Sequence, residues 1–405
     1  MHWREMDQTV LPANARVPQG ERTFHRVGIP GTPGGSFDLV VKAGRIAGFE
    51  RHCREPAQWM LLPPLADLHV HANRAFTLGS ELPTSLEHAI RMAREVFATM
   101  TGREYDAQAT RFFRQAFSKG TTRIRTHADI DPGMLLAAVE GTLSARERIR
   151  DLLDVEVVAF ASSAADPTDV RVRAQLREAC HLGAELLGAV PAYYADPRKS
   201  IDALLELAIE LDRAVDVHLD EHLDAGRSMS EYLAEATLAR GLQGRVTLSH
   251  GCAISALHRD ARQRVAERLA LAGIMVIVLP TTNLYLQGRG SDLPGPRGLT
   301  AVRELAAAGV ALRFASDNVR DAFFPYGGAD LLDIAQLAAI AAQIDDPGLL
   351  VRGVCGGVAS LDVGAVASFV LVPGASLGAI LAERPTQRVI MRRGAVLAAS
   401  PQCAP

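Results

Sequence analysis

Eight short β-rich runs, most of them separated by longer amphipathic stretches, extend over most of this 405-residue chain. Stretches such as Ile201–Ala214, Ala261–Ala272 and Thr300–Ala308 have helical apolar spacing, and Gly273 and Gly309 stand where helix-terminating glycines belong. Eight β units joined by helical crossovers predict an α/β fold, a (β/α)8 TIM-type barrel. The rival architecture is a doubly wound open sheet, but no G-x-G-x-x-G opens a helix after the first strand. The expected barrel strands are Leu65–Val70, Thr122–Thr126, Val155–Phe160, Glu185–Val190, Ala214–Val217, Val246–Ser249, Ile274–Leu279 and Ala311–Ala315.

Both ends of the chain carry short β patterns with turns instead of long helices. Near the start these are Phe37–Val41 and Arg45–Phe49, and near the end they are Ser368–Val372, Arg388–Met391 and Val396–Ala398. We therefore expect a small β-sandwich domain built from residues 1–61 plus 368–405. The catalytic barrel would then occupy residues 62–367.

Composition narrows the class of protein. Apolar residues make up 48% and charged residues 22%, which is typical of a folded globular chain. The net charge of −3 provides no strong field for nucleic acid or an anionic membrane. Neither a signal-peptide core nor an apolar stretch of about 20 residues is present in the sequence. Five scattered cysteines without a C-x-x-C pair disfavour a disulfide framework and a thiolate zinc site. We expect a cytoplasmic protein without nucleic-acid or membrane partners, and the sequence leaves open whether it is a homo-oligomer.

Metal-ligand residue types recur at the ends of the expected strands. His69 and His71 end the first strand as H-x-H, and residues two apart on a strand share a face. The other candidates are His127, His218, His250 and Asp317, at the ends of the second, fifth, sixth and eighth strands. All strand ends of a barrel face the same mouth, so these side chains are expected to converge on a metal ion.

Two further motifs match known hydrolase signatures by letter but do not fit the expected structure. His218 to His222 spells the H-x-x-E-H peptidase pattern, which needs a helix, whereas His218 follows a β-like run. Gly374 to Gly378 spells G-x-S-x-G, but the triad histidine of that fold would have to come later in the chain and none does, so we interpret it as a turn. For His127 a buried core histidine with a backbone partner remains an alternative.

Six segments together resemble the cytosine deaminase-like branch of the amidohydrolase superfamily. They are PPLADLHVH, TRIRTHADID, AVDVHLDE, VTLSHG, NLYLQGR and FASDNVRDAFFPYG. The last of them is also similar to triazine-processing members such as N-isopropylammelide hydrolase.

The resemblance implies a ligand set and a proton-transfer set. His69, His71, His218 and Asp317 would bind one divalent ion, Zn²⁺ or Fe²⁺. Glu221 and His250 would act beside it as acid and base groups, with Asp317 also orienting the metal-bound hydroxide. Two-metal members carry a modified lysine at the end of the fourth strand, where this chain has Gly188-Ala-Val-Pro191, so a mononuclear site is expected.

Departures from the branch concern the substrate. Ser162 stands where cytosine deaminases carry a glutamine that reads the pyrimidine, and Asn73 and Asn318 replace two aspartates. We expect Ser162, Asn318, Gln287 and His127 to bind the substrate, and we expect cytosine to be a poor one.

The predicted function is hydrolytic deamination of an amino-substituted N-heterocycle, such as a pyrimidine, pterin or triazine, by metal-bound hydroxide. Cleavage of another C–N bond, in a cyclic amide or an N-alkylamino triazine, is the first alternative. A non-catalytic binding protein on the same fold is the second, although such proteins usually lose ligands that this chain retains.

Overall fold

The computed structural model describes residues 20–32, 35–52, 55–133, 136–289, 297–358 and 360–399. The chain divides into two compact units. One consists of Leu68–Gln115 and Ile124–Ala329, and the other contains Ala116–Arg123 with the described residues up to Asp67 and from Asp330 onward. The expected domain boundaries at residues 61/62 and 367/368 stay a prediction.

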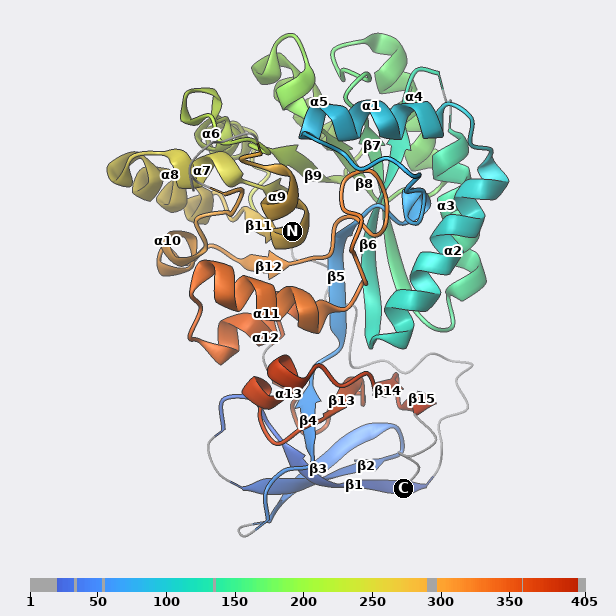
Figure 1. Ribbon diagram of the computed structural model, residues 1–405, viewed down its shortest axis with the longest axis vertical. Helices are drawn as coiled ribbons and strands as arrows, with labels where there is room; N and C mark the ends of the chain where they lie inside the picture. The colour runs from blue at the N-terminus through green and yellow to red at the C-terminus, as the bar shows by residue number, and fades with distance from the viewer. Residues whose placement is uncertain are drawn as a thin grey trace. The chain divides into compact units, whose positions relative to one another are not determined.

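Eight strands form a nearly closed barrel, which confirms the predicted fold class (Figure 1). Each successive pairing from β7 to β12 is parallel. A further parallel bridge between Val70 and Asp317 joins the end of the first barrel strand to the segment after the last one. The hydrogen-bonded order follows the chain through β5 (Leu65–Val70), β6 (Thr121–Ile130), β7 (Asp154–Ala161), β8 (Leu186–Ala189), β9 (Ala214–Leu219), β10 (Val246–His250), β11 (Met275–Val278) and β12 (Leu312–Phe314).

Helices connect most of these strands, and α2, α3, α8 and α10 lie outside them in Figure 1. Glycines with positive φ, Gly273 and Gly309, follow α8 and α10 as expected. The helix expected over Ile201–Ala214 begins earlier, because Asp196 caps it and Pro197 opens it. It also ends earlier, at Glu210, so that Ala214 starts β9. The α-helices up to β12 are α1 (Leu86–Phe97), α2 (Gly102–Ser118), α3 (Ala137–Ile149), α4 (Val170–Leu182), α5 (Pro197–Glu210), α6 (Ser230–Ala239), α7 (Cys252–Ala256), α8 (Arg259–Leu271), α9 (Pro280–Leu286) and α10 (Val302–Ala307).

The second sheet is assembled from both termini, as predicted, in the order β15-β14-β13-β4-β1-β2-β3. Two of its hairpins turn through Ala43-Gly44 and Arg393-Gly394, and all four residues have positive φ, which suits tight hairpin turns. Its core includes Leu39, Ile46 and Phe369. The strands are β1 (Glu21–Gly28), β2 (Ser36–Lys42), β3 (Arg45–His52), β4 (Trp59–Leu62), β13 (Phe369–Pro373), β14 (Val389–Arg392) and β15 (Ala395–Ala399).

The remaining α-helices are α11 (Leu331–Ala342), α12 (Pro347–Val354) and α13 (Leu377–Glu383). Ser376 of the G-x-S-x-G stretch is the N-cap of α13, where its hydroxyl accepts a hydrogen bond from the Ala379 amide, so the stretch is a helix start. Cys180, Cys252 and Cys355 are buried free thiols, and Cys53 and Cys403 lie outside the described residues. No helix in the described part of the chain is long and apolar enough to cross a membrane.

Candidate active site

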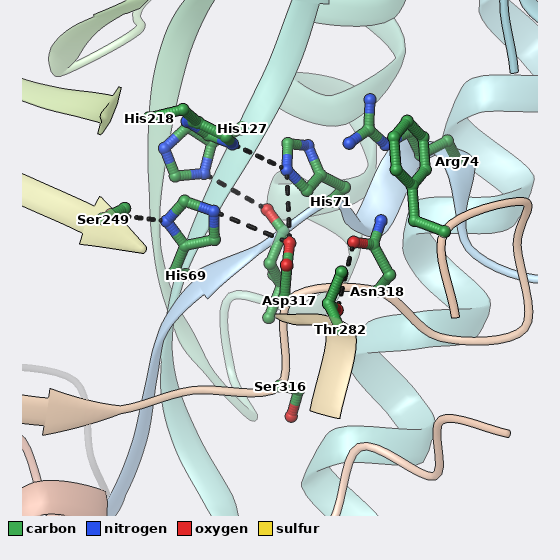
Figure 2. Close-up of polar contacts among 12 residues, drawn as sticks. His69, His71, Arg74, His127, His218, Ser249, Thr282, Ser316, Asp317 and Asn318 are labelled. Carbon is green, nitrogen blue, oxygen red and sulfur yellow. Dashed lines mark hydrogen bonds and ion pairs between the residues drawn. The ribbon is translucent and has the colours of Figure 1, made fainter. Parts of the chain in front are cut away.

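Histidine nitrogens and one carboxylate from three predicted strand ends lie within a few ångströms of each other (Figure 2). His71 Nε2 lies 3.1 Å from His218 Nε2. The Oδ1 atom of Asp317 lies 3.7 Å from His69 Nε2 and 3.5 Å from His71 Nε2. Zinc binds such atoms at about 2.0–2.2 Å, so donor atoms at these separations fit around one ion.

The protonation state of the histidines also suits a cation. Burial lowers the pKa of His69 to about 3 and holds the pKa values of His71, His218 and His250 well below their usual range. Neutral imidazoles offer a lone pair to a metal. His69 Nε2 and His250 Nε2 are buried and have no hydrogen-bond partner among the described residues. Two sets, His69/His218/His250 and His69/His71/His127, each place three ligand atoms within 4.8 Å of one another. The residues present therefore fit a bound metal ion.

A buried hydrogen-bond chain behind His69 fixes which of its nitrogens faces the cluster. Ser249 Oγ donates to Asp216 Oδ1 at 2.7 Å and lies 2.8 Å from His69 Nδ1. Because the hydroxyl hydrogen points to Asp216, the Ser249 oxygen accepts from His69 Nδ1–H. Arg125 Nη1 donates to the other oxygen of Asp216 at 2.9 Å. The lone pair of His69 thus resides on Nε2, which faces Asp317.

The backbone is held in an uncommon conformation at three of the strand ends. Asp220, His250 and Asp317 have φ values of 56°, 77° and 60°. This left-handed region costs non-glycine residues on the order of 1–3 kcal/mol and is concentrated at functional sites. The carboxylate of Asp220 accepts hydrogen bonds from the Ser228 hydroxyl and the Met229 amide, which anchors the loop after β9.

Glu221 follows β9 and turns its carboxyl toward the cluster. Its side chain is 10% exposed, and its Oε1 lies 3.6 Å from His250 Nδ1. Burial raises the pKa of Glu221 well above the usual carboxyl value, and the nearby Asp317 carboxylate raises it further. A raised pKa favours the neutral, protonated form of this carboxyl, which is the form that can donate a proton. His222 follows in a bend instead of a helix, so the H-x-x-E-H segment lacks the peptidase geometry.

A cavity of about 400 Å³ opens next to this cluster. His71, His218, His250, Glu221 and Asp317 line one part of it. An apolar wall from α1 and its surroundings lines another, formed by Leu86, Ile90, Ala93, Phe97, Ala98 and Phe323. The volume lies within the range of about 300–1,000 Å³ that is typical of small-molecule sites.

The four expected substrate-binding residues have different positions. Ser162 and Asn318 line the cavity; the Ser162 hydroxyl donates to Asp131 Oδ2 at 2.9 Å. Gln287 Nε2 donates to the Glu221 carbonyl at 2.9 Å, and His127 is buried with its Nδ1 3.4 Å from the Val70 carbonyl. Gln287 and His127 are absent from the described lining, and their contact with substrate stays a prediction.

Sequence reasoning missed Arg74 and Asp129, which also line the cavity, and the supporting residues Ser249 and Asp216. A signal for some of them was present. Asp129 and Asp216 each lie two residues from a strand-end histidine, His127 or His218, and so share its face of the strand.

Comparison with known proteins decides the family. The amidohydrolase family profile matches residues 84–344, more than half of the chain. The chain belongs to the amidohydrolase family. It is thus a hydrolase of C–N bonds outside peptides, and this excludes the alternative of a non-catalytic binding protein. The family is metal-dependent, in agreement with a histidine cluster that could hold an ion.

Several amidohydrolases align over most of their length. A pterin deaminase of Rhizobium rhizogenes is 29% identical over 425 aligned residues, covering 95% of this chain and 94% of the relative. The crystal structure of 5-methylcytosine deaminase from Klebsiella pneumoniae with phosphonocytosine has a TM-score of 0.85 at 25% identity, covering 94% and 98% of the two chains. The crystal structure of N-isopropylammelide isopropylaminohydrolase from Burkholderia multivorans has a TM-score of 0.78 at 27% identity and also covers 94% and 98% of the two chains.

Proposed function

We propose that this amidohydrolase removes the amino group of an amino-substituted N-heterocycle as ammonia. The observation that carries the proposal is Glu221, a carboxyl of raised pKa held beside the histidine cluster and lining the cavity. Such a group can give a proton to a ring nitrogen and later to the departing amine.

His69, His71, His218 and Asp317 would hold one divalent ion, zinc or iron, since imidazole and carboxylate suit both. When bound, such an ion acts as a Lewis acid that lowers the pKa of a water ligand to about 7. The fourth strand ends in Gly188-Ala189 without a lysine, which supports one ion instead of two.

The proton transfers are assigned to three side chains. Asp317 and His250 would orient the attacking water and accept its proton. Glu221 would protonate the ring nitrogen beside the amine-bearing carbon as water adds there. The C–N bond then breaks, the carbon keeps the oxygen as a carbonyl, and the amine leaves with one more proton as ammonia. Positioned transfers of this kind contribute about 10²–10⁴-fold each.

The first-choice substrate is a fused bicyclic ring of the pterin type. The pterin deaminase of Rhizobium rhizogenes aligns with nearly the whole chain, which supports this choice. Short side chains, Ala161 to Ala164, also stand where cytosine deaminases carry a longer glutamine side chain, and they leave room for a second ring.

A second candidate is release of an alkylamine from an N-alkylamino triazine. The apolar wall of Leu86, Ile90 and Ala93 offers a surface for an alkyl group. The structural relative from Burkholderia multivorans is named for the removal of such a group. The two candidates differ in their nitrogen product, ammonia or an alkylamine.

A substrate panel tests the proposal. Metal-loaded protein would be given aminopterins, cytosine, aminopurines and N-alkylamino triazines, with ammonia and alkylamine measured separately. We expect ammonia, with the highest kcat/KM on an aminopterin. Release of alkylamine alone would support the second candidate, and no nitrogen release from any of them would contradict both.

A further inference from the structure

Arg74 is a charged side chain at the cavity to which the proposed proton transfers give no role. It follows His71 by three residues and ends η1 (Ala72–Arg74). Its side chain is only 8% exposed, yet it lines the cavity. Phe323 and Phe97 lie beneath the guanidinium, with their ring centroids 4.6 and 5.7 Å from its central carbon. These rings hold the flat group in place by cation–π contact.

The hydrogen bonds of Arg74 leave donor capacity unused. Nη1 donates to Asp129 Oδ1 at 3.1 Å. Nε is buried and has no partner among the described residues. Leaving a buried polar donor unpaired costs about 1–3 kcal/mol, and more for a charged group. With Nη1 bonded to Asp129, the guanidinium keeps further N–H donors that can serve an acceptor on a bound ligand.

Both carboxylate oxygens of Asp129 accept hydrogen bonds. One accepts from the Arg74 guanidinium, and the other accepts from Asn73 Nδ2 at 3.2 Å. Both members of the pair line the cavity, and because a carboxylate can only accept, Arg74 is the member that can donate to a ligand there.

We propose that Arg74 is a specificity-determining residue that binds an exocyclic oxygen of the substrate and an unprotonated ring nitrogen that lies beside this oxygen. Guanidinium presents two N–H donors in a planar fork, which matches an oxo group beside a ring nitrogen acceptor. The substrate class is therefore an N-heterocycle that carries an oxo group as well as the amine. This inference rests on the proposed deamination for its reaction, but ligand binding can test it separately.

The test compares matched ligands in wild-type protein and in Arg74→Gln. The substrates are 2-amino-4-oxopteridine and 2-aminopteridine, which differ by the oxo group. We expect Arg74→Gln to lower kcat/KM on the first by about 10²-fold or more, because a site built to hydrogen-bond a group discriminates strongly by it. On the second substrate we expect little change. An equal loss on both substrates would indicate a structural role and overturn the proposal.

Binding of 2,4-dioxopteridine and of 2-oxopteridine, measured by calorimetry, provides a readout without turnover. Wild-type protein should prefer the dioxo ring, and Arg74→Gln should reduce that preference about tenfold, which corresponds to about 1.4 kcal/mol. No preference in the wild type, or the same preference in the variant, would overturn the proposal. If the wild type binds the dioxo ring selectively but releases no ammonia, the proposed function fails while the role of Arg74 stands.

Two further variants serve as controls for misfolding. Arg74→Lys keeps the charge without the fork and should show an intermediate loss with normal metal content. Arg111 is stacked on Phe76 at 4.0 Å and is outside the described cavity lining, so Arg111→Gln should behave as wild type. Should Arg111→Gln change the ligand preference as strongly as Arg74→Gln, the effect would not belong to the cavity and the proposal would be overturned.

Discussion

His71 Nε2 and His218 Nε2 lie 3.1 Å apart, although 147 residues separate them in the chain. Both atoms are buried on neutral imidazoles, because burial lowers the pKa of each ring well below its usual value. Two neutral nitrogens at this distance are arranged for a shared cation, since ligand atoms around zinc stand about 2.0–2.1 Å from the ion.

The first prediction tests this pair. His218→Ala should reduce the bound metal to a small fraction and abolish activity, because it removes a proposed ligand. His222→Ala, four residues further on, is the matched control and should retain metal and activity. Elemental analysis of both purified variants measures their metal content. A wild-type metal content in His218→Ala would contradict the assignment of His218 as a metal ligand.

A second prediction concerns Ser249, whose oxygen accepts from His69 Nδ1 and whose hydrogen goes to Asp216. Ser249→Ala should weaken metal affinity by about 10–100-fold, the usual effect of losing an outer-shell partner. Among the described residues Ser255 donates to the Cys252 carbonyl, so Ser255→Ala should leave metal affinity unchanged. Competition with a chelator measures the metal affinity of both variants. If Ser249→Ala bound metal as tightly as Ser255→Ala, Ser249 would have no role in supporting the metal site.

The sequence predicts the eight barrel strands because each is a short β-rich run with its own turn signals. It predicts the convergence of His69, His218 and His250 because parallel barrel strands place their carboxyl ends at one mouth. The support of His69 depends on contacts between different strands. Ser249 of β10 bonds Asp216 of β9 and lies beside His69 of β5, and such contacts are not encoded in the spacing within one strand.

The Arg74–Asp129 pair shows the same limit. An arginine three residues after an H-x-H has no local pattern that distinguishes it from a solvated side chain. Its burial depends on Phe97 of α1 and on Phe323, both remote in sequence. The contribution of α1 to the cavity wall likewise depends on tertiary packing against Leu286, Ala322 and Phe323.

The third prediction addresses proton transfer by Glu221. Glu221→Gln should keep the metal but lose about 10²-fold or more in kcat, because an amide cannot donate and accept the transferred proton. Glu231→Gln, in α6 and outside the described cavity lining, is the control and should retain kcat. Near-normal turnover in Glu221→Gln would move the role to another group, with His250 the next candidate.

The fourth prediction concerns cytosine. Ser162 directs its hydroxyl to Asp131, and a longer side chain at this position of the lining would reach further into the cavity. Wild-type protein should turn over cytosine poorly, and Ser162→Gln should raise kcat/KM for it. A wild-type kcat/KM for cytosine above about 10⁵ M⁻¹s⁻¹, within the usual enzyme range, would show that Ser162 does not exclude it.

Metal titration with ammonia release as the readout tests the central claim most directly. Metal-free protein would receive increasing Zn²⁺ or, in the absence of oxygen, Fe²⁺, and ammonia release from 2-amino-4-oxopteridine would be measured at each point. The account predicts activity that rises with added metal and saturates at about one equivalent per chain, as a site with one set of ligands requires. Saturation only at two equivalents would contradict the single-ion site, and no ammonia from this or any other amino-heterocycle at any metal content would contradict the proposed function.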